Sequence, residues 1–171
     1  MCGESRFQST RPDPLAVSLP AFRRNRWLNW VGLLAATTTV LLVALSPPLL
    51  SPTWRAAIMH GFSPLCHQLP SRSPILYGGQ IAICDRCVGI YLGLVIGIAT
   101  VGGAHRLWVR LGARDRLVLL GSLGPMAVDW IGPVLSLWNN GPISRALTGL
   151  LFGVVAASFV ADRLLWGRIK E

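Results

Sequence analysis

The sequence predicts an all-α integral membrane protein, a bundle of four transmembrane helices, and three observations support this fold class. First, 52% of the 171 residues are hydrophobic and only 13% are charged, against roughly 25% charged in an average soluble domain. Second, four segments are largely apolar and about 20 residues long, the length that a helix needs to cross ~30 Å of hydrocarbon. Third, most basic residues lie between or outside these segments, as expected of a multi-pass protein.

The predicted spans cover residues 27–45, 81–104, 117–137 and 146–166. They divide the chain into an N-terminal tail (1–26), a membrane domain (27–166) and a short C-terminal tail (167–171). The long connection over 46–80 opens with prolines, which cannot continue a helix. Within it, the apolar stretch from Trp54 to Phe62 predicts a short helix that lies on the membrane interface or dips back into the bilayer.

The distribution of charge predicts how the spans are oriented. Twelve of the sixteen Lys and Arg residues fall in the N-terminal tail, between the second and third spans, or at the C-terminal end. With four spans these regions share one side of the lipid bilayer, which the positive-inside rule assigns to the cytoplasm. We therefore expect a multi-pass plasma-membrane protein with both termini in the cytoplasm. Because the net charge of +9 then reflects topology, we do not expect nucleic-acid binding.

Small residues recur at four-residue spacing in two of the spans. They stand at positions 89, 93 and 97 of the second span and 149, 153 and 157 of the fourth. Faces of this kind let helix backbones approach closely. We expect them to pack the bundle internally, with a partner helix from another protein as the alternative.

Polar residues unusual for a membrane protein converge on the outer ends of the spans. At 1.5 Å per helical residue, Cys84, Arg86 and Cys87 lie on the order of 5 to 9 Å below the outer surface. Asp129 lies about 12 Å below the same surface. An Asp at such a depth normally faces the bundle interior with a partner. We expect that partner to be Arg86 or Arg145, and an ion pair that only fixes helix packing is the structural alternative.

The cysteines predict either metal binding or thiol chemistry. Cys84 and Cys87 are three residues apart and share one helix face, an arrangement that suits a metal site or a redox dithiol. Cys66 and His67 in the outer loop could complete a ligand set, and thiolates with imidazole favour zinc, copper(I) or iron–sulfur. Since the outer face of a cell membrane is oxidising, a disulfide from Cys66 to Cys84 or Cys87 is an alternative, as are inert buried thiols.

Three functional hypotheses follow. In the first, a zinc-like ion is bound by Cys66, His67, Cys84 and Cys87, with Asp129 as proton acceptor or orienting group. Three arginines would clamp a lipid or another anionic substrate for hydrolase or lipid-modifying chemistry: Arg72, Arg86 and Arg145. The second is outward-facing thiol–disulfide exchange, and the third is a non-enzymatic accessory subunit of a membrane complex. The sequence leaves open whether the protein is an enzyme.

Four motifs resemble a family of small prokaryotic membrane proteins catalogued as domain of unknown function 2085. The motifs begin at "CHQLPSRS", at "CDRCVGIYLG", at the Asp of the third span and at "SRALTGLLFG". The matching residues are Cys66, His67, Gln68, Pro70, Arg72, Ser73, Cys84, Arg86, Cys87, Gly89, Tyr91, Gly93, Asp129, Arg145, Thr148, Gly149 and Gly153. The resemblance implies a polytopic membrane protein with a shared Cys, His, Arg and Asp set, and it implies no particular activity.

Overall fold

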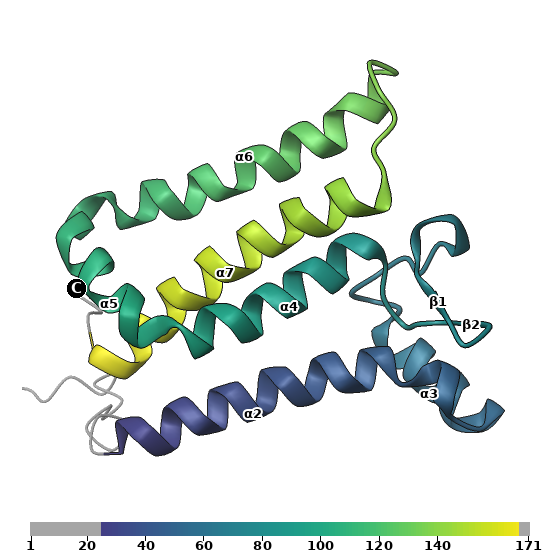
Figure 1. The fold of residues 1–171 in the computed structure, drawn as a ribbon, viewed down its shortest axis with the longest axis horizontal. Helices are drawn as coiled ribbons and strands as arrows, with labels where there is room; N and C mark the ends of the chain where they lie inside the picture. The colour runs from purple at the N-terminus through teal and green to yellow at the C-terminus, as the bar shows by residue number, and fades with distance from the viewer. Residues whose placement is uncertain (1–24, 168–171) are drawn as a thin grey trace, which may run out of the picture.

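The computed structural model describes residues 25–167, and within them the chain is mainly helical (Figure 1). The α-helices are α2 (Arg26–Leu45), α3 (Pro52–Phe62), α4 (Asp85–Ala99), α5 (Val101–Leu111), α6 (Asp115–Val134) and α7 (Pro142–Trp166). Short elements join them: the 3₁₀ turns η1 (Pro47–Leu49), η2 (Pro70–Arg72) and η3 (Gly112–Arg114), and the strands β1 (Ile75–Leu76) and β2 (Gly79–Gln80). The prediction of an all-α fold is confirmed. The predicted tails lie outside the described residues, except for Asn25, Arg26 and Gly167.

Three helices are each long and apolar enough to cross a membrane: α2, α6 and α7. A fourth span is available only if α4 and α5 count together, and these two helices are bent by 85°. The structure therefore differs from the straight helix predicted over 81–104. Residues before Asp85 are not helical, since the Ala82 N–H bonds the carbonyl of Ala44 at 3.0 Å. The bend falls at Thr100, which ends α4 and precedes α5, and Gly102 and Gly103 lie in the first turn of α5.

The two outer boundaries of the third and fourth spans also differ from the predicted ones. Helix α6 ends at Val134 rather than 137, and the chain then reverses through Ser136, which has a φ of 57°. Helix α7 begins at Pro142 rather than 146, with Gly141 preceding it. Proline suits the first turn of a helix because the N–H that it lacks would have no intrahelical partner there.

The long helices lie side by side in the order α2, α4, α7 and α6 (Figure 1). The glycine faces of α4 and α7 pack on each other, so closely that an added Cβ at Gly89 would lie 2.0 Å from the Ala146 carbonyl oxygen. A Cβ at Gly153 would lie 2.3 Å from the carbonyl oxygen of Ile90. The small-residue faces thus serve the internal packing that the sequence predicts. In this structure they are covered by each other rather than open to a partner helix.

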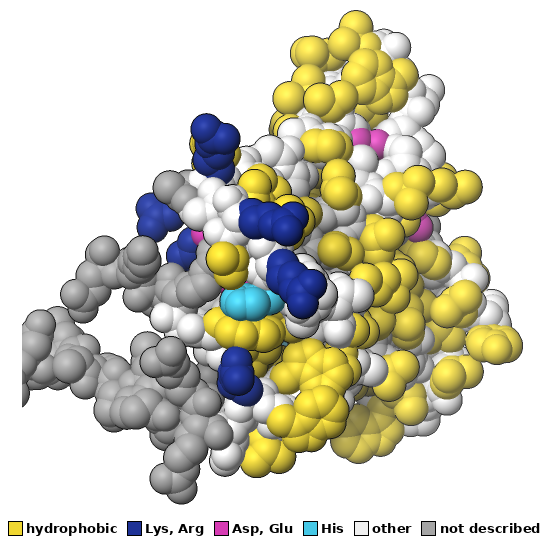
Figure 2. Space-filling view, turned by 60° about the vertical axis from the view of Figure 1, so that its left-hand side comes forward, with side chains coloured by type: hydrophobic (Ala, Val, Ile, Leu, Met, Phe, Trp, Pro, Cys, Tyr) yellow, Lys and Arg dark blue, Asp and Glu magenta, His cyan; other side chains and the backbone are white. Residues whose placement is uncertain are grey.

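The bundle has two chemically different ends. At one end, which we call the cysteine end, the start of α4 with Cys84 and Cys87 meets the loop that carries Cys66. At the opposite end, here the basic end, lie α5, η3 and the start of α6, with Arg106, Arg110, Arg114 and Arg116. Figure 2, which brings this end forward, shows Lys and Arg side chains gathered there and apolar side chains along the flank of the bundle.

Two buried carboxylates tie the basic end together. His105 Nδ1 lies 2.6 Å from the Asp162 carboxylate, and the His105 ring stacks on Trp166 with centroids 4.3 Å apart. Arg163 donates to Asp115 at 2.7 Å. Because α5 carries His105 and α7 carries its partner, these contacts fix the bent helix against the bundle.

The connection over 46–84 closes the cysteine end. Helix α3 begins at Pro52 and accounts for the helix predicted over Trp54 to Phe62. The β1–β2 hairpin turns through Tyr77 and Gly78, whose φ angles are 48° and 77°. Ile81 and Ile83 are buried with Ala44 and Cys66 in one apolar cluster. This cluster anchors the loop on the ends of α2 and α4 and so positions the first of the three cysteines.

Candidate metal and anion site

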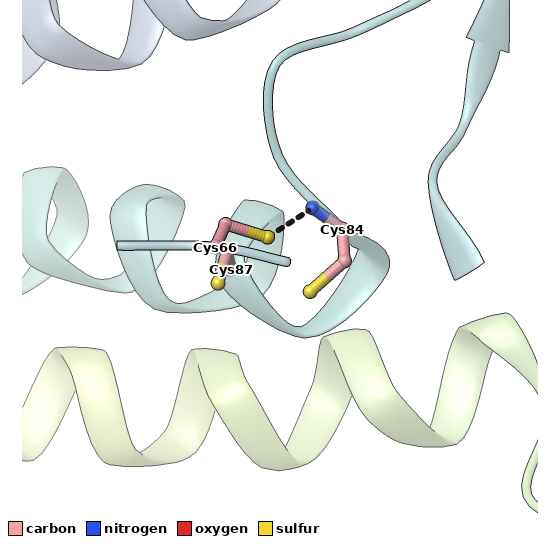
Figure 3. Close-up of side chains that lie close together, drawn as sticks. All are labelled: Cys66, Cys84 and Cys87. Carbon is pink, nitrogen blue, oxygen red and sulfur yellow. Dashed lines mark hydrogen bonds between the residues drawn. The ribbon is translucent and has the colours of Figure 1, made fainter. Parts of the chain in front are cut away.

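Three cysteines from two parts of the chain meet at the first turn of α4. Cys84 precedes the helix, Cys87 lies one turn into it, and Cys66 comes from the loop after α3 (Figure 3). Their sulfur atoms all lie within 4.8 Å of one another. The Cys84 backbone N–H donates to the Cys66 sulfur at 3.2 Å. Cys66 is buried and the other two are half-buried, and all three are free thiols.

The position of Cys84 favours a thiolate. This residue stands at the N-terminus of α4, where the helix dipole stabilises negative charge. A thiolate is the form of cysteine that binds metals or attacks a disulfide.

His67 follows Cys66 but is not part of the sulfur cluster. No nitrogen of its ring joins the group of mutually close ligand atoms found among the described residues. The chain turns directly after it at Gln68, which has a φ of 50°. The Gln68 side chain holds this turn by donating to the Met59 carbonyl at 2.7 Å. His67 is left exposed at the mouth of the site.

Asp129 is paired with Arg86, one of the two partners that the sequence suggests. Arg86 Nη2 donates to Asp129 Oδ2 at 2.5 Å, and both side chains are largely buried. Asn140 donates to the same oxygen at 3.0 Å, and Ser144 donates to Oδ1. Both carboxylate oxygens therefore accept hydrogen bonds within the protein, and Asp129 holds Arg86 in place.

Arg145, the other suggested partner, pairs with Asp85 instead. Arg145 Nη1 lies 3.6 Å from Asp85 Oδ2. The guanidinium also donates to the Asn140 side-chain oxygen, from Nε at 3.0 Å and from Nη2 at 2.8 Å. Asn140 therefore bridges the two ion pairs, since its amide nitrogen bonds Asp129 and its oxygen accepts from Arg145.

Three residues of this network are missing from the sequence-based site: Asp85, Asn140 and Ser144. The position of Asp85, between Cys84 and Arg86, was a usable signal, because a carboxylate there needs a cation. Asn140 and Ser144 carry no comparable signal, since polar residues are ordinary in a short connection between spans. Only the fold of that connection directs Asn140 toward the carboxylate.

A pocket of about 390 Å³ opens beside the cysteines. Seven of the eight residues singled out from the sequence line it: Cys66, His67, Arg72, Cys84, Arg86, Cys87 and Arg145. The eighth, Asp129, is not among the lining residues and contacts the pocket only through Arg86. Leu65, Gln68, Leu69 and Trp130 complete the lining. The structure thus gathers the predicted residues around one cavity.

Comparisons with known proteins identify relatives of the chain. A family model described as "Predicted membrane protein (DUF2085)" matches residues 66–159, which is more than half of the chain and begins at the first cysteine of the site. The "Uncharacterized protein MJ1492" of Methanocaldococcus jannaschii is 30% identical over 99 residues, 58% of this chain. The match spans 63% of that archaeal protein's length. No solved structure matches the chain.

Proposed function

The chain belongs to the DUF2085 family of predicted membrane proteins, and from this premise we propose that it holds a zinc-like, thiophilic metal ion at the cysteine end. The observation that carries the proposal is the convergence of three sulfur atoms within 4.8 Å of one another. One comes from a loop and two from a single helix turn, so the chain must fold to bring them together.

The donor set fits such an ion. Zinc binds thiolates at ~2.3 Å in tetrahedral geometry, which places two bound sulfurs ~3.8 Å apart. That spacing is compatible with the observed cluster. Soft sulfur ligands select zinc or copper(I) over magnesium or calcium. The N–H of Cys84 on the Cys66 sulfur supports a ligating thiolate, as hydrogen bonds around metal sites commonly do.

The charges of the surroundings also favour a cation. Asp129 and Asp85 already neutralise Arg86 and Arg145, so these two ion pairs bring little net charge to the cluster. Three thiolates held together would repel one another, and a divalent cation removes most of that repulsion.

We propose an open coordination site rather than a closed one. Three protein ligands with a free fourth position are typical of catalytic zinc, whereas structural zinc has four protein ligands. The three cysteines and His67 line the same pocket, and we propose that the fourth position faces it. A bound ion of this kind supplies Lewis-acid chemistry, which would suit hydrolase or lipid-modifying activity. The sequence predicts His67 as a metal ligand. We therefore expect that removing its side chain weakens metal binding without abolishing it.

The arginines and Asp129 take distinct roles in this proposal. Arg72, Arg86 and Arg145 line the pocket and would bind the substrate. Asp129 would act as a positioning residue, because its oxygens are occupied by Arg86, Asn140 and Ser144. A proton-acceptor role would require it to release one of these contacts.

For the cell, we propose that the protein lies in the plasma membrane with its basic end and both termini in the cytoplasm. The gathering of arginines at the end opposite the cysteines supports this orientation. The metal site would then face the outside.

Elemental analysis of the detergent-purified protein tests the metal site, with thiols counted on the same sample. We expect near-stoichiometric zinc or another thiophilic metal, lost in a Cys84→Ala, Cys87→Ala double variant. The matched control is Cys2→Ala, which removes the one cysteine outside the predicted site. His67→Ala should keep the metal with lower affinity. Metal-free protein from a zinc-supplemented culture would refute the proposal.

Thiol–disulfide exchange is the second candidate, and a specific observation favours it. Cys84 and Cys87 sit at the N-terminus of α4, where a dithiol gains from the helix dipole. Cys66 lies close enough to serve as the resolving thiol. This function predicts a redox-dependent change in alkylation that disappears in Cys87→Ser. Thiols that resist alkylation after both reduction and oxidation would exclude it.

A further inference from the structure

We propose that the pocket beside the cysteines binds the phosphate headgroup of a membrane lipid. This inference rests on the proposed function for the metal ion, and it identifies the class of molecule that the same pocket accepts. Three features carry it: the guanidinium of Arg86, a surplus of positive charge at the mouth of the pocket, and an apolar rim.

The first feature is the guanidinium of Arg86. Its Nη2 is bonded to Asp129, which fixes the group in place. The side chain keeps 21% of its surface exposed and lines the pocket. An oxyanion is the partner that a guanidinium binds most strongly.

The second feature is a surplus of positive charge at the mouth. Arg86 and Arg145 are each held by a carboxylate, but Arg72 is exposed and the structure shows it no ion pair within residues 25–167. Arg72 also lines the pocket. The first turn of α4 adds the positive end of a helix dipole at the same place. A pocket with these groups attracts an anion with several oxygens, such as a phosphate ester.

The third feature, the rim, decides the source of the phosphate. Leu65, Leu69 and Trp130 line the pocket, and 68%, 46% and 56% of their respective surfaces are exposed. Trp130 stands on α6, whose side chains away from α7 would face hydrocarbon in the bilayer. A free phosphate ion would gain nothing from these side chains. A lipid would place its headgroup against the arginines and its acyl chains along the apolar rim.

Lipid retention by the metal-loaded protein tests the inference. The protein is reconstituted in phosphatidylcholine nanodiscs that contain a minor fraction of either phosphatidic acid or diacylglycerol, and bound lipid is quantified by native mass spectrometry. We expect selective retention of phosphatidic acid. Arg72→Gln should weaken it by about tenfold or more, since hydrogen bonds to charged groups contribute on that scale. The matched control is Arg55→Gln, which removes the same charge at the same end but outside the pocket lining.

Three results would overturn the headgroup site. If Arg72→Gln and Arg55→Gln weaken the retention of phosphatidic acid equally, the effect is general electrostatic attraction. If diacylglycerol is retained as well as phosphatidic acid, the phosphate plays no role in binding. Displacement by inorganic phosphate as efficiently as by added phosphatidic acid would reassign the pocket to a free anion. Metal content is measured on the same samples. If the purified protein contains metal but does not select phosphatidic acid, this inference alone is refuted. If the purified protein contains no metal but still binds lipid in a way that depends on Arg72, the metal site alone is refuted.

Discussion

Replacing Gly149 with alanine should force α4 and α7 apart next to the cysteines. The new Cβ would lie 2.3 Å from the Arg86 carbonyl oxygen, while ordinary contact begins near 3.4 Å, so the helices must separate by about 1.1 Å, the difference between the two. The clash is with backbone, which cannot rotate away as a side chain can. Overpacking of this kind costs about 1–3 kcal/mol.

Thermal unfolding in detergent, followed by tryptophan fluorescence, measures this cost. With about 2–4 °C per kcal/mol for a chain of this size, we expect the melting temperature to fall by about 2–12 °C. Metal occupancy should fall as well, because Arg86 adjoins Cys87 on the displaced turn. Gly121→Ala is the matched control, since a Cβ at Gly121 meets nothing within 4 Å. It should be neutral or stabilise by up to about 1 kcal/mol. Equal effects of the two variants would refute the packing argument.

Three further variants test the network and the basic end. Asp129→Asn should destabilise the protein by about 1.5–3 kcal/mol, because it leaves Arg86 without its charge partner; an unchanged melting temperature would contradict this. Asn140→Ala should cost more stability than Asn139→Ala, since only Asn140 bridges both ion pairs. Equal losses would remove the bridging role. His105→Ala should lower the melting temperature through its lost carboxylate contact and ring stack, yet leave the metal content measured by elemental analysis unchanged. Loss of metal from the His105→Ala variant would contradict this expectation and would show that the two ends of the bundle are coupled.

The choice of partners in the ion pairs shows how much of the site can be predicted from the sequence. Depth along the helices placed Asp129 near Arg86 and Arg145 without deciding between them, because both arginines are at similar depth. The structure decides for Arg86, whose side chain extends from the first turn of α4 to Asp129 on α6. Arg145 is drawn to Asp85 and Asn140 on the neighbouring surface. Pair choice depends on the rotation of each helix about its axis, which spacing alone does not give.

The second span shows the same limit. Its apolar length predicted one straight helix over 81–104, whereas α4 ends at Ala99 and α5 turns away by 85°. Hydropathy measures how apolar the residues of both helices are, and it does not depend on the direction in which each helix runs. The bend at Thr100 is fixed by the contact between His105 and Asp162 near the end of α7. That contact is tertiary.

The sequence by itself determined that this protein is an all-α membrane bundle and which residues gather at one end of it. It could do so because apolar length, charge distribution and residue spacing are properties of the chain before folding. Only the tertiary structure decided that Cys66 joins Cys84 and Cys87, that His67 stands apart from them, and that Asn140 bridges both ion pairs. These contacts come from a loop packed on helix ends, so they arise only when the glycine faces of α4 and α7 lock the bundle together.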